Sequence, residues 1–380
     1  MKRPEFVVDL VKAAFIVLIV KVMATSSKII PWNALLDSLS IVFALSVMML
    51  KLLRHTFRLK TFLALSAVSL MVLYTCVSIG QYDLLVSLVA ICLVIDEDLK
   101  SYITLMLKVQ VAILLFHVAI AGLMSLTGLS TNFWLWTNDR YRFKGGFNHP
   151  NTISSYILSC IMMFSWLRFR RITANEFGWL VCVVVISFLL TKTRTALLLN
   201  IALLFILYYA QRGNRLVIKC VDFITPLLFP IISLMTYWVQ THYYSGGSII
   251  TILDKLLTGR VKYAAYAYLR SGTTWLPRYL DYVETRKVMW TPEWNLNTFT
   301  FDCLYSYLFI QQGMIWIGII TVIIFFLCRK IDFRNKLFLL IWIINGLVEV
   351  HGLNCFKFFP ILLLSMLLSE KGGRGSSELQ

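Results

Sequence analysis

The sequence predicts an all-α integral membrane protein, and three observations support this fold class. Hydrophobic residues make up 59% of the 380 residues and charged residues only 14%, whereas a soluble domain is about 45–50% apolar and about 25% charged. The apolar residues gather in runs, most of them long enough to cross a hydrocarbon core of about 30 Å. Short, mostly basic segments separate these runs. Because backbone groups in lipid must be satisfied within the protein, each run is expected to be a helix.

Twelve apolar runs set the order of the predicted elements. Nine lie within residues 1–238 and three within residues 302–371, on either side of a long loop at 239–301. Residues 372–380 are small and polar, and we interpret them as a tail outside the fold. The fourth, seventh, eleventh and twelfth runs are short. The expected helices are 6–25, 34–53, 61–79, 82–96, 102–126, 149–167, 176–191, 194–211, 216–238, 302–327, 336–350 and 353–369.

Positive charges between the runs predict the orientation of the chain. Cytoplasmic loops carry an excess of Lys and Arg, and placing the N-terminus inside puts the short basic loops on that side. The tight outer turns at 26–33 and 80–81 hold one cation, Lys28. Both termini are therefore expected in the cytoplasm of a bacterial-type cell. These topology signals account for much of the net charge of +17, so nucleic acid is not an expected partner.

The segment 140–151, before the sixth run, combines positive charge with a helix N-terminus. Three cations precede a Gly-Gly turn, and Pro150 suits the first helical turn, with Asn148 or His149 near the cap. The free N–H groups of a helix N-terminus attract an anion. The alternative, a membrane-interface anchor with snorkelling basic side chains, is equally compatible with the composition. The cations are Arg140, Arg142 and Lys144.

The turn 191–195 places Lys192 and Arg194 on the outer side, where short loops rarely hold cations. Cations at the membrane edge are functional candidates, and neighbouring hydroxyls can bind the same oxyanion. We favour an anion-binding role for this turn over simple contact with lipid headgroups.

Two more candidates bracket the long outer loop. Thr258-Gly-Arg260 leads an amphipathic stretch that contains Tyr263; it is either a helix lying in the membrane interface or a source of a phosphate-pairing Arg. Asp302 opens the tenth run and is either a helix N-cap, which its spacing favours, or a general base. At the outer junction of the last two runs, Glu349, His351 and Lys357 are interpreted first as a structural ion-pair group.

These motifs, in this order, resemble the Wzy-type polysaccharide polymerases and the O-antigen ligase superfamily. The resemblance covers roughly residues 130–320. It is carried by Arg142 with the Gly-Phe-Asn-His-Pro-Asn run at 146–151, by Lys-Thr-Arg-Thr-Ala-Leu at 192–197, by Thr-Gly-Arg at 258–260, and by Asp302 eleven positions before Gly313.

The resemblance implies a metal-independent glycosyltransferase of the GT-C type that needs no cofactor. It would join undecaprenyl-diphosphate-linked repeat units, donor to acceptor, on the outer face of the bacterial cytoplasmic membrane, with a flippase and a chain-length regulator as partners. Asp302 would be the catalytic base. Cations on the leaving diphosphate would be Arg194 and Arg260, supported by Lys192, Arg140, Arg142 and Lys144, while Asn148, His149, Asn151, Tyr263 and Tyr305 would contact substrate.

Three alternatives stay open, and one of them is a non-catalytic membrane scaffold with an incidental cationic outer site. The ligase branch of the family commonly has His at the position of Asp302, so this departure favours a polymerase over an O-antigen ligase. A transporter of lipid-linked oligosaccharide would also fit twelve spans, although transporters usually show related halves and broken helices near mid-membrane.

Overall fold

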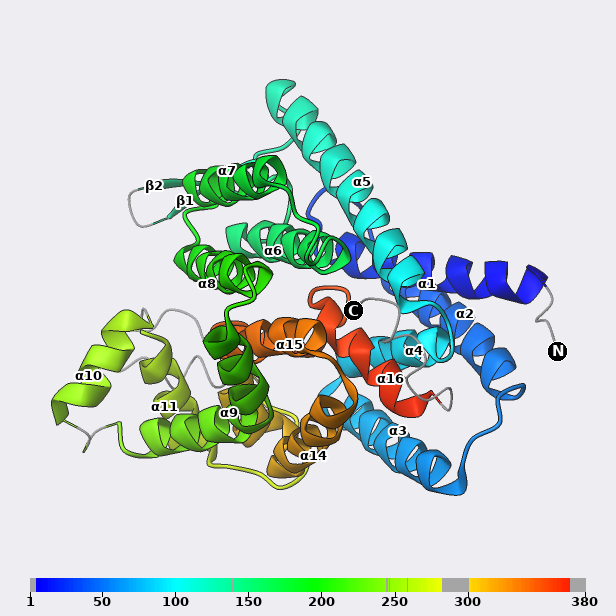
Figure 1. The fold of residues 1–380 in the computed structure, drawn as a ribbon. Coiled ribbons are helices and arrows are strands. Elements are labelled where there is room, and N and C mark those ends of the chain that lie inside the picture. Colours follow the sequence, from blue (N-terminus) through cyan, green and yellow to red (C-terminus); the bar gives the residue numbers. More distant parts are fainter. Residues whose placement is uncertain are drawn as a thin grey trace. The chain divides into compact units, whose positions relative to one another are not determined.

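The computed structural model describes residues 5–137, 140–243, 245, 247–257, 259–281 and 301–369, and most of them are helical (Figure 1). The chain divides into two compact units. Unit 1 comprises the described residues up to 58, residues 86–219 and the described residues from 355 on. Unit 2 comprises residues 59–85 and the described residues of 220–354.

Six helices among the described residues are long and apolar enough to cross a membrane, judged by length and composition. They leave large apolar side chains exposed; Val77 and Leu126, for example, are each 87% exposed. Water would not tolerate so much exposed apolar surface, whereas lipid would. The predicted membrane character is therefore confirmed. The six helices are α2 (Ala34–Leu52), α3 (Leu59–Ile79), α5 (Leu99–Leu126), α7 (Ala174–Thr191), α8 (Arg194–Gln211) and α9 (Arg215–Thr241).

Polar residues at the boundaries of the apolar runs determine where helices begin and end. The Asn33 and Asp98 side chains accept hydrogen bonds from backbone N–H groups in the first turns of α2 and α5. Thr173 and Glu176 form a reciprocal capping box at the start of α7. That helix ends at Lys192, which adopts the left-handed conformation with φ of 53°. Local chemistry therefore explains why the first nine predicted runs match helices so closely.

Unit 1 contains one element that the all-α prediction lacks, a two-stranded hairpin. Strand β1 (Trp134–Thr137) pairs antiparallel with β2 (Arg140–Phe143), and their aromatic residues favour strands. In the same unit α6 packs against α5, α7 and α8, and α7 contacts β2 (Figure 1). The remaining elements are α1 (Glu5–Thr25), α6 (Pro150–Leu167), η3 (Phe359–Leu364) and α16 (Ser365–Leu368), together with most of α4 (Asp83–Val94).

Unit 2 contradicts the prediction of a continuous helix over 302–327. The segment is instead a short helix, one π-helical turn and a longer helix that starts after Gly313, which has φ of 99°. The predicted helix at 353–369 is also wrong as a single element, because a 3-10 helix ends at Leu353, residues 354–358 are not helical, and helical structure resumes over 359–368. The elements of unit 2 are α3, most of α9, α10 (Gly247–Leu256), α11 (Arg260–Ser271), α13 (Leu304–Tyr307), η1 (Leu308–Gln312), α14 (Met314–Lys330), α15 (Phe333–Asn345) and η2 (Val350–Leu353).

The helix break is held by an extended segment, residues 272–281, which we call the strap. The N–H of Thr274 donates to the carbonyl of Phe309 over 3.0 Å, and the Thr274 carbonyl accepts from the N–H of Met314 over 2.8 Å. Arg278 donates through its backbone N–H to Gln311 and through Nε to the carbonyl of Ile310, over 3.0 and 2.8 Å. A broken helix leaves backbone groups without helical partners, and the strap supplies partners for them.

Contacts between helix ends agree with the predicted sides of the chain. In unit 1, Nε2 of His55 lies 2.7 Å from a carboxylate oxygen of Asp96, and both residues belong to segments predicted inside. At the opposite helix ends, the N–H of Lys28 donates to the carbonyl of Gly146 over 2.9 Å, and both belong to turns predicted outside. Each contact joins two segments with the same predicted side, and the orientation itself stays a prediction.

Replacing Gly313 tests the helix break. A Cβ at this position would lie 2.5 Å from the Trp275 carbonyl oxygen and would also require an L residue at φ of 99°, a conformation that costs roughly 1–3 kcal/mol. Gly313→Ala should therefore lower the thermal unfolding midpoint in detergent. Gly318→Ala is the matched control, because nothing lies within 4 Å of its Cβ position and Ala favours a helix by about 1 kcal/mol. Equal midpoints for the two variants would contradict the strap's role.

Candidate functional site

Arg142, on β2, joins three segments of unit 1. Its Nε donates to the carbonyl of Thr191 over 2.9 Å, and its Nη2 donates to Oδ1 of Asn151 over 2.9 Å and to Oγ1 of Thr193 over 3.3 Å. The planar guanidinium holds such acceptors in a fixed geometry. We call these four residues the Arg142 cluster. Because the guanidinium binds the protein itself, Arg142 positions the turn between α7 and α8 against the start of α6.

The turn held by the Arg142 cluster presents two cations. Lys192 is half-buried in the left-handed conformation, and Arg194 is exposed at the first position of α8. Within the described part of the chain, neither side chain makes a hydrogen bond or an ion pair. Their charges are therefore not neutralised locally, and their predicted role in binding a diphosphate stays a prediction.

A second pair of cations, Lys28 and Lys144, lies beside the Gly-Gly turn at 145–146. The backbone of this turn bonds to the end of α1, and a Cβ on Gly146 would lie 2.3 Å from Ile29. Lys144 is buried, and its Nζ donates to Oδ1 of Asn132 over 2.9 Å. Burial and, secondly, the charge of Lys28 lower the pKa of Lys144. Such mutual repulsion would be relieved by an anion bound between the two ammonium groups.

His149 caps α6, as one of the two residues expected there. Its Nδ1 accepts a hydrogen bond from the N–H of Asn151 over 3.2 Å, so Nδ1 carries no proton. The residue keeps exposed surface, but partial desolvation of the imidazole and then the charges of Arg142 and Lys144 lower the pKa of His149 from 6.5 to about 4. Asn148 is exposed. Arg140 lies in β2, and its side chain is outside the described part of the structure.

In unit 2 the structure pairs two residues that the sequence predicted independently. Nε of Arg260, at the start of α11, lies 3.6 Å from a carboxylate oxygen of Asp302, just before α13. The Arg260 side chain is only 11% exposed, and that of Asp302 is 42% exposed. Burial and then the negative charge of Asp302 raise the pKa of Tyr263, one turn along α11. The three predicted site residues therefore form one cluster.

Tyr305 has a different environment from the one expected for a substrate-binding residue. It is fully buried, and its hydroxyl donates to the carbonyl of Ile343 over 2.7 Å. Phe229 packs against the ring. Its aromatic position beside Asp302 in the sequence suggested ligand contact, but α13 turns the ring into the core of unit 2. We assign Tyr305 a packing role.

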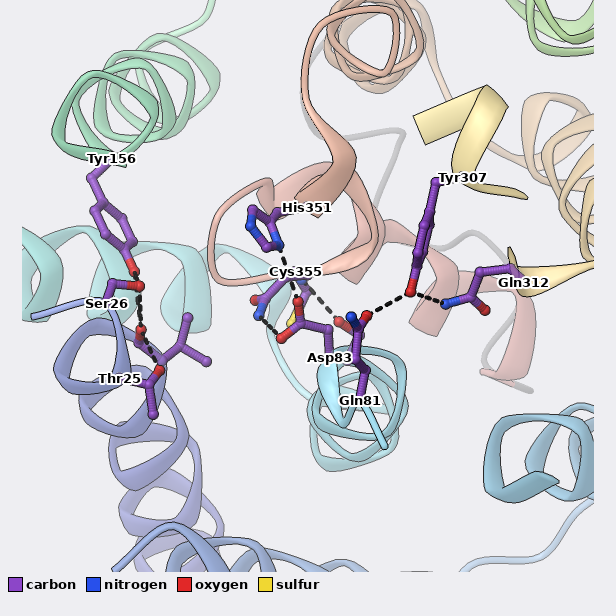
Figure 2. A network of polar contacts seen from close by, with 12 residues as sticks. Thr25, Ser26, Gln81, Asp83, Tyr156, Tyr307, Gln312, His351 and Cys355 are labelled. Atoms are coloured by element: carbon purple, nitrogen blue, oxygen red, sulfur yellow. Dashed lines mark hydrogen bonds and ion pairs between the residues drawn. The ribbon is translucent and has the colours of Figure 1, made fainter. Parts of the chain in front are cut away.

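Sequence reasoning missed a polar network around the start of α4, shown in Figure 2. In unit 2, the Tyr307 hydroxyl donates to Oε1 of Gln81 over 2.5 Å and accepts from Nε2 of Gln312 over 2.9 Å. Nδ1 of His351 lies 3.4 Å from one carboxylate oxygen of Asp83, whose other oxygen accepts from Asn354. The sequence singled out His351 as a member of a structural ion-pair group, but its partner Asp83 lies more than 200 residues away and could not be recognised from spacing.

Within unit 1, Figure 2 also shows the hydroxyls of Ser26 and Tyr156, which lie 3.3 Å apart. The Tyr156 hydroxyl further donates to the carbonyl of Val22 over 3.1 Å. These buried bonds join the end of α1 to α6, and they hold the turn that carries Lys28.

The fold and these clusters define a helical membrane protein that carries charged clusters at helix ends in each of its two units. Comparison with protein-family models, curated proteins and solved structures found no significant match. The class therefore rests on the structure, and any narrower function is a proposal.

The cap at His149 predicts a pH effect on stability. Because the pKa of His149 is lower in the folded chain, at about 4, the unfolded chain binds a proton below its ordinary value of 6.5 while the folded chain does not, so stability should fall as the pH drops from 6.5 towards 4. His149→Asn keeps a capping oxygen and does not titrate. The thermal midpoint of the wild type should fall further than that of the variant between pH 7 and pH 5. Parallel curves for the two proteins would exclude a depressed pKa at His149.

Proposed function

We propose that this protein is a glycosyltransferase that polymerises undecaprenyl-diphosphate-linked oligosaccharide units on the outer face of a bacterial cytoplasmic membrane. The observation that carries the proposal is the Arg260–Asp302 pair, a nearly buried guanidinium with an ion-paired carboxylate. The proposal keeps cytoplasmic termini. The helix breaks change the last three of the twelve predicted spans into shorter helical pieces.

The pair suits the departure of a diphosphate. Charge-assisted bonds from Arg to phosphate oxygens are strong and are often bidentate, and low exposure strengthens them further. An arriving diphosphate would compete with Asp302 for Arg260 and become its new partner. When the bond between the sugar and the diphosphate breaks, the electron pair leaves with the diphosphate, and Arg260 stabilises that charge.

Before the diphosphate arrives, Asp302 is the counter-ion of Arg260. In the observed pair, the charge of the carboxylate balances that of the guanidinium. The observed pairing therefore favours a counter-ion role over the catalytic base that the sequence predicted. Displacement by diphosphate would free the carboxylate at the moment of transfer.

Unit 1 supplies cations for the same class of ligand. Lys192 and Arg194 are not paired within the described residues, and the charge of Lys28 acts on buried Lys144. Outer loops with uncompensated positive charge would attract the diphosphate of a second lipid-linked unit. The proposed partners are thus the donor lipid, the acceptor lipid and the surrounding membrane, with a flippase and a chain-length regulator acting before and after chain growth.

A second candidate function, transport of the same lipid-linked oligosaccharide, is favoured by the helix break at 308–313. Broken helices near polar side chains are typical of transporters, and the break here lies beside Gln312 and Tyr307. A ligase would share the proposed chemistry but use a different acceptor. Chain growth on a lipid-linked unit distinguishes the polymerase from both.

The test is reconstitution of the full chain in liposomes with the lipid-linked oligosaccharide that accumulates in cells when the chain is deleted. We expect longer glycans and release of undecaprenyl diphosphate. Arg260→Ala should lower chain growth roughly 100-fold or more, as loss of one stabilising donor does in other enzymes. Arg270→Ala, an exposed cation on the same helix, is the matched control and should be active.

Transport of labelled lipid across the bilayer without any growth of the glycan would contradict the polymerase and support the transporter. Equal activity of the two Arg variants would instead exclude the diphosphate role of Arg260 and leave the enzyme class standing.

A further inference from the structure

The acid–base pair formed by Asp83 and His351 has no role in the proposal above. Nδ1 of His351 lies 3.4 Å from one carboxylate oxygen of Asp83. Nδ2 of Asn354 donates to the other carboxylate oxygen over 3.1 Å. The carboxylate is thus held from both sides, with its imidazole partner on one of them (Figure 2).

This arrangement favours one tautomer of the neutral imidazole. A neutral ring that faces a carboxylate through Nδ1 carries its proton there, so Nε2 keeps the lone pair and can accept a proton. The His351 side chain is 50% exposed and the Asp83 side chain 40%, so a ligand from outside can reach the ring. A purely structural ion pair would not require this accessibility.

The loop that carries His351 is firmly attached. The carbonyl of Gly346 accepts from the N–H of Leu304 over 2.8 Å, and the carbonyl of Gly352 accepts from Nε1 of Trp342 over 2.6 Å. Leu304 also packs against Gly352, where an added Cβ would lie 3.1 Å from its side chain. The imidazole is therefore held on a rigid support.

The same short helix connects this pair to the proposed diphosphate site. Asp302 lies two residues before Leu304, and Tyr307, at the other end of α13, bonds to Gln81 in the turn that leads to Asp83. Both pairs thus involve segments that adjoin or contact α13 within unit 2. Asp83, at the start of α4, is the charged group that faces His351, and Glu349 lies two residues before His351 on the same loop.

We infer that His351 is the proton acceptor for the attacking sugar hydroxyl of the acceptor lipid, with Asp83 as its positioning residue; this inference rests on the proposed function. The hydroxyl proton passes to Nε2 while the hydroxyl oxygen forms a bond to the anomeric carbon of the donor. The bond from that carbon to the diphosphate breaks, and its electron pair leaves with undecaprenyl diphosphate. Nε2 then returns its proton to water or to the released diphosphate. Asp302 is the counter-ion of Arg260 before the diphosphate arrives and takes no part in this proton transfer.

The test measures chain growth in the same liposomes with the accumulated lipid-linked oligosaccharide as donor and acceptor. His351→Asn keeps an N–H that can face Asp83 but removes the Nε2 lone pair. Its rate should fall roughly 100-fold or more without a change in the thermal midpoint. A variant rate within about tenfold of the wild type would overturn the inference.

A second readout does not depend on polymerisation. Diethyl pyrocarbonate acylates unprotonated imidazole nitrogen, and peptide mass spectrometry locates the product. His351 should react, and Asp83→Asn should slow its reaction by removing the carboxylate that faces Nδ1 and orients the ring. Unchanged reactivity in Asp83→Asn would overturn the positioning role even if the protein makes polymer.

The two readouts separate the failure of the inference from the failure of the proposed function. Polymer made at the normal rate by His351→Asn overturns the inference alone. A wild type that makes no polymer, but whose His351 reacts faster than in Asp83→Asn, overturns the sugar-hydroxyl substrate and the proposed function, and supports the acid–base pair itself.

Discussion

The structure of unit 2 depends on satisfying the backbone groups that the helix break at Gly313 exposes. In lipid an unpaired backbone N–H or carbonyl has no water to form a hydrogen bond with. A helix break can therefore persist only where the protein supplies the hydrogen-bond partners. The strap does so through Thr274 and Arg278. The strap follows α11 directly and bonds to η1, the turn after α13. It therefore links the segment that begins at Arg260 to the segment that follows Asp302.

The arginines of this protein show how one residue type takes several roles. Arg278 donates to backbone carbonyls, and Arg142 donates to one carbonyl and to the side chains of Asn151 and Thr193, so both hold segments in place. Arg260 instead faces a carboxylate that a more highly charged anion can displace. Arg194 is exposed and makes no ion pair within the described residues. Only the last two are suited to a ligand, a distinction that a count of positive charges cannot make.

Most of the helical framework could be predicted from the sequence. The first nine apolar runs coincide with helices because hydropathy, capping residues such as Thr173 and the positions of basic loops are all local signals. The failures begin at residue 302. Hydropathy reports that a segment avoids water, but it does not report whether the helix is continuous. Gly313 was visible as a residue of interest, yet its partner Trp275 belongs to a distant loop and could not be inferred from spacing.

The candidate site was predictable to the same extent. The pairing of Arg260 with Asp302 and the cap at His149 agree with residues chosen from motif and spacing. Arg142 was chosen correctly as a residue of interest, but its internal hydrogen bonds give it a positioning role. Asp83 was overlooked because its partner lies at the other end of unit 2. A motif indicates which residues are of interest, but it does not indicate their partners when these are distant in the sequence.

The most direct test of this account is the affinity of the purified protein for undecaprenyl diphosphate, measured by native mass spectrometry with undecaprenol as the uncharged comparison. Arg260→Ala should weaken binding by roughly tenfold or more, since charge-assisted bonds to a largely desolvated phosphate are strong. Asp302→Asn should strengthen it, because the competing carboxylate is gone. Equal affinity in all three proteins, or equal binding of undecaprenol, would contradict the exchange of partners at Arg260.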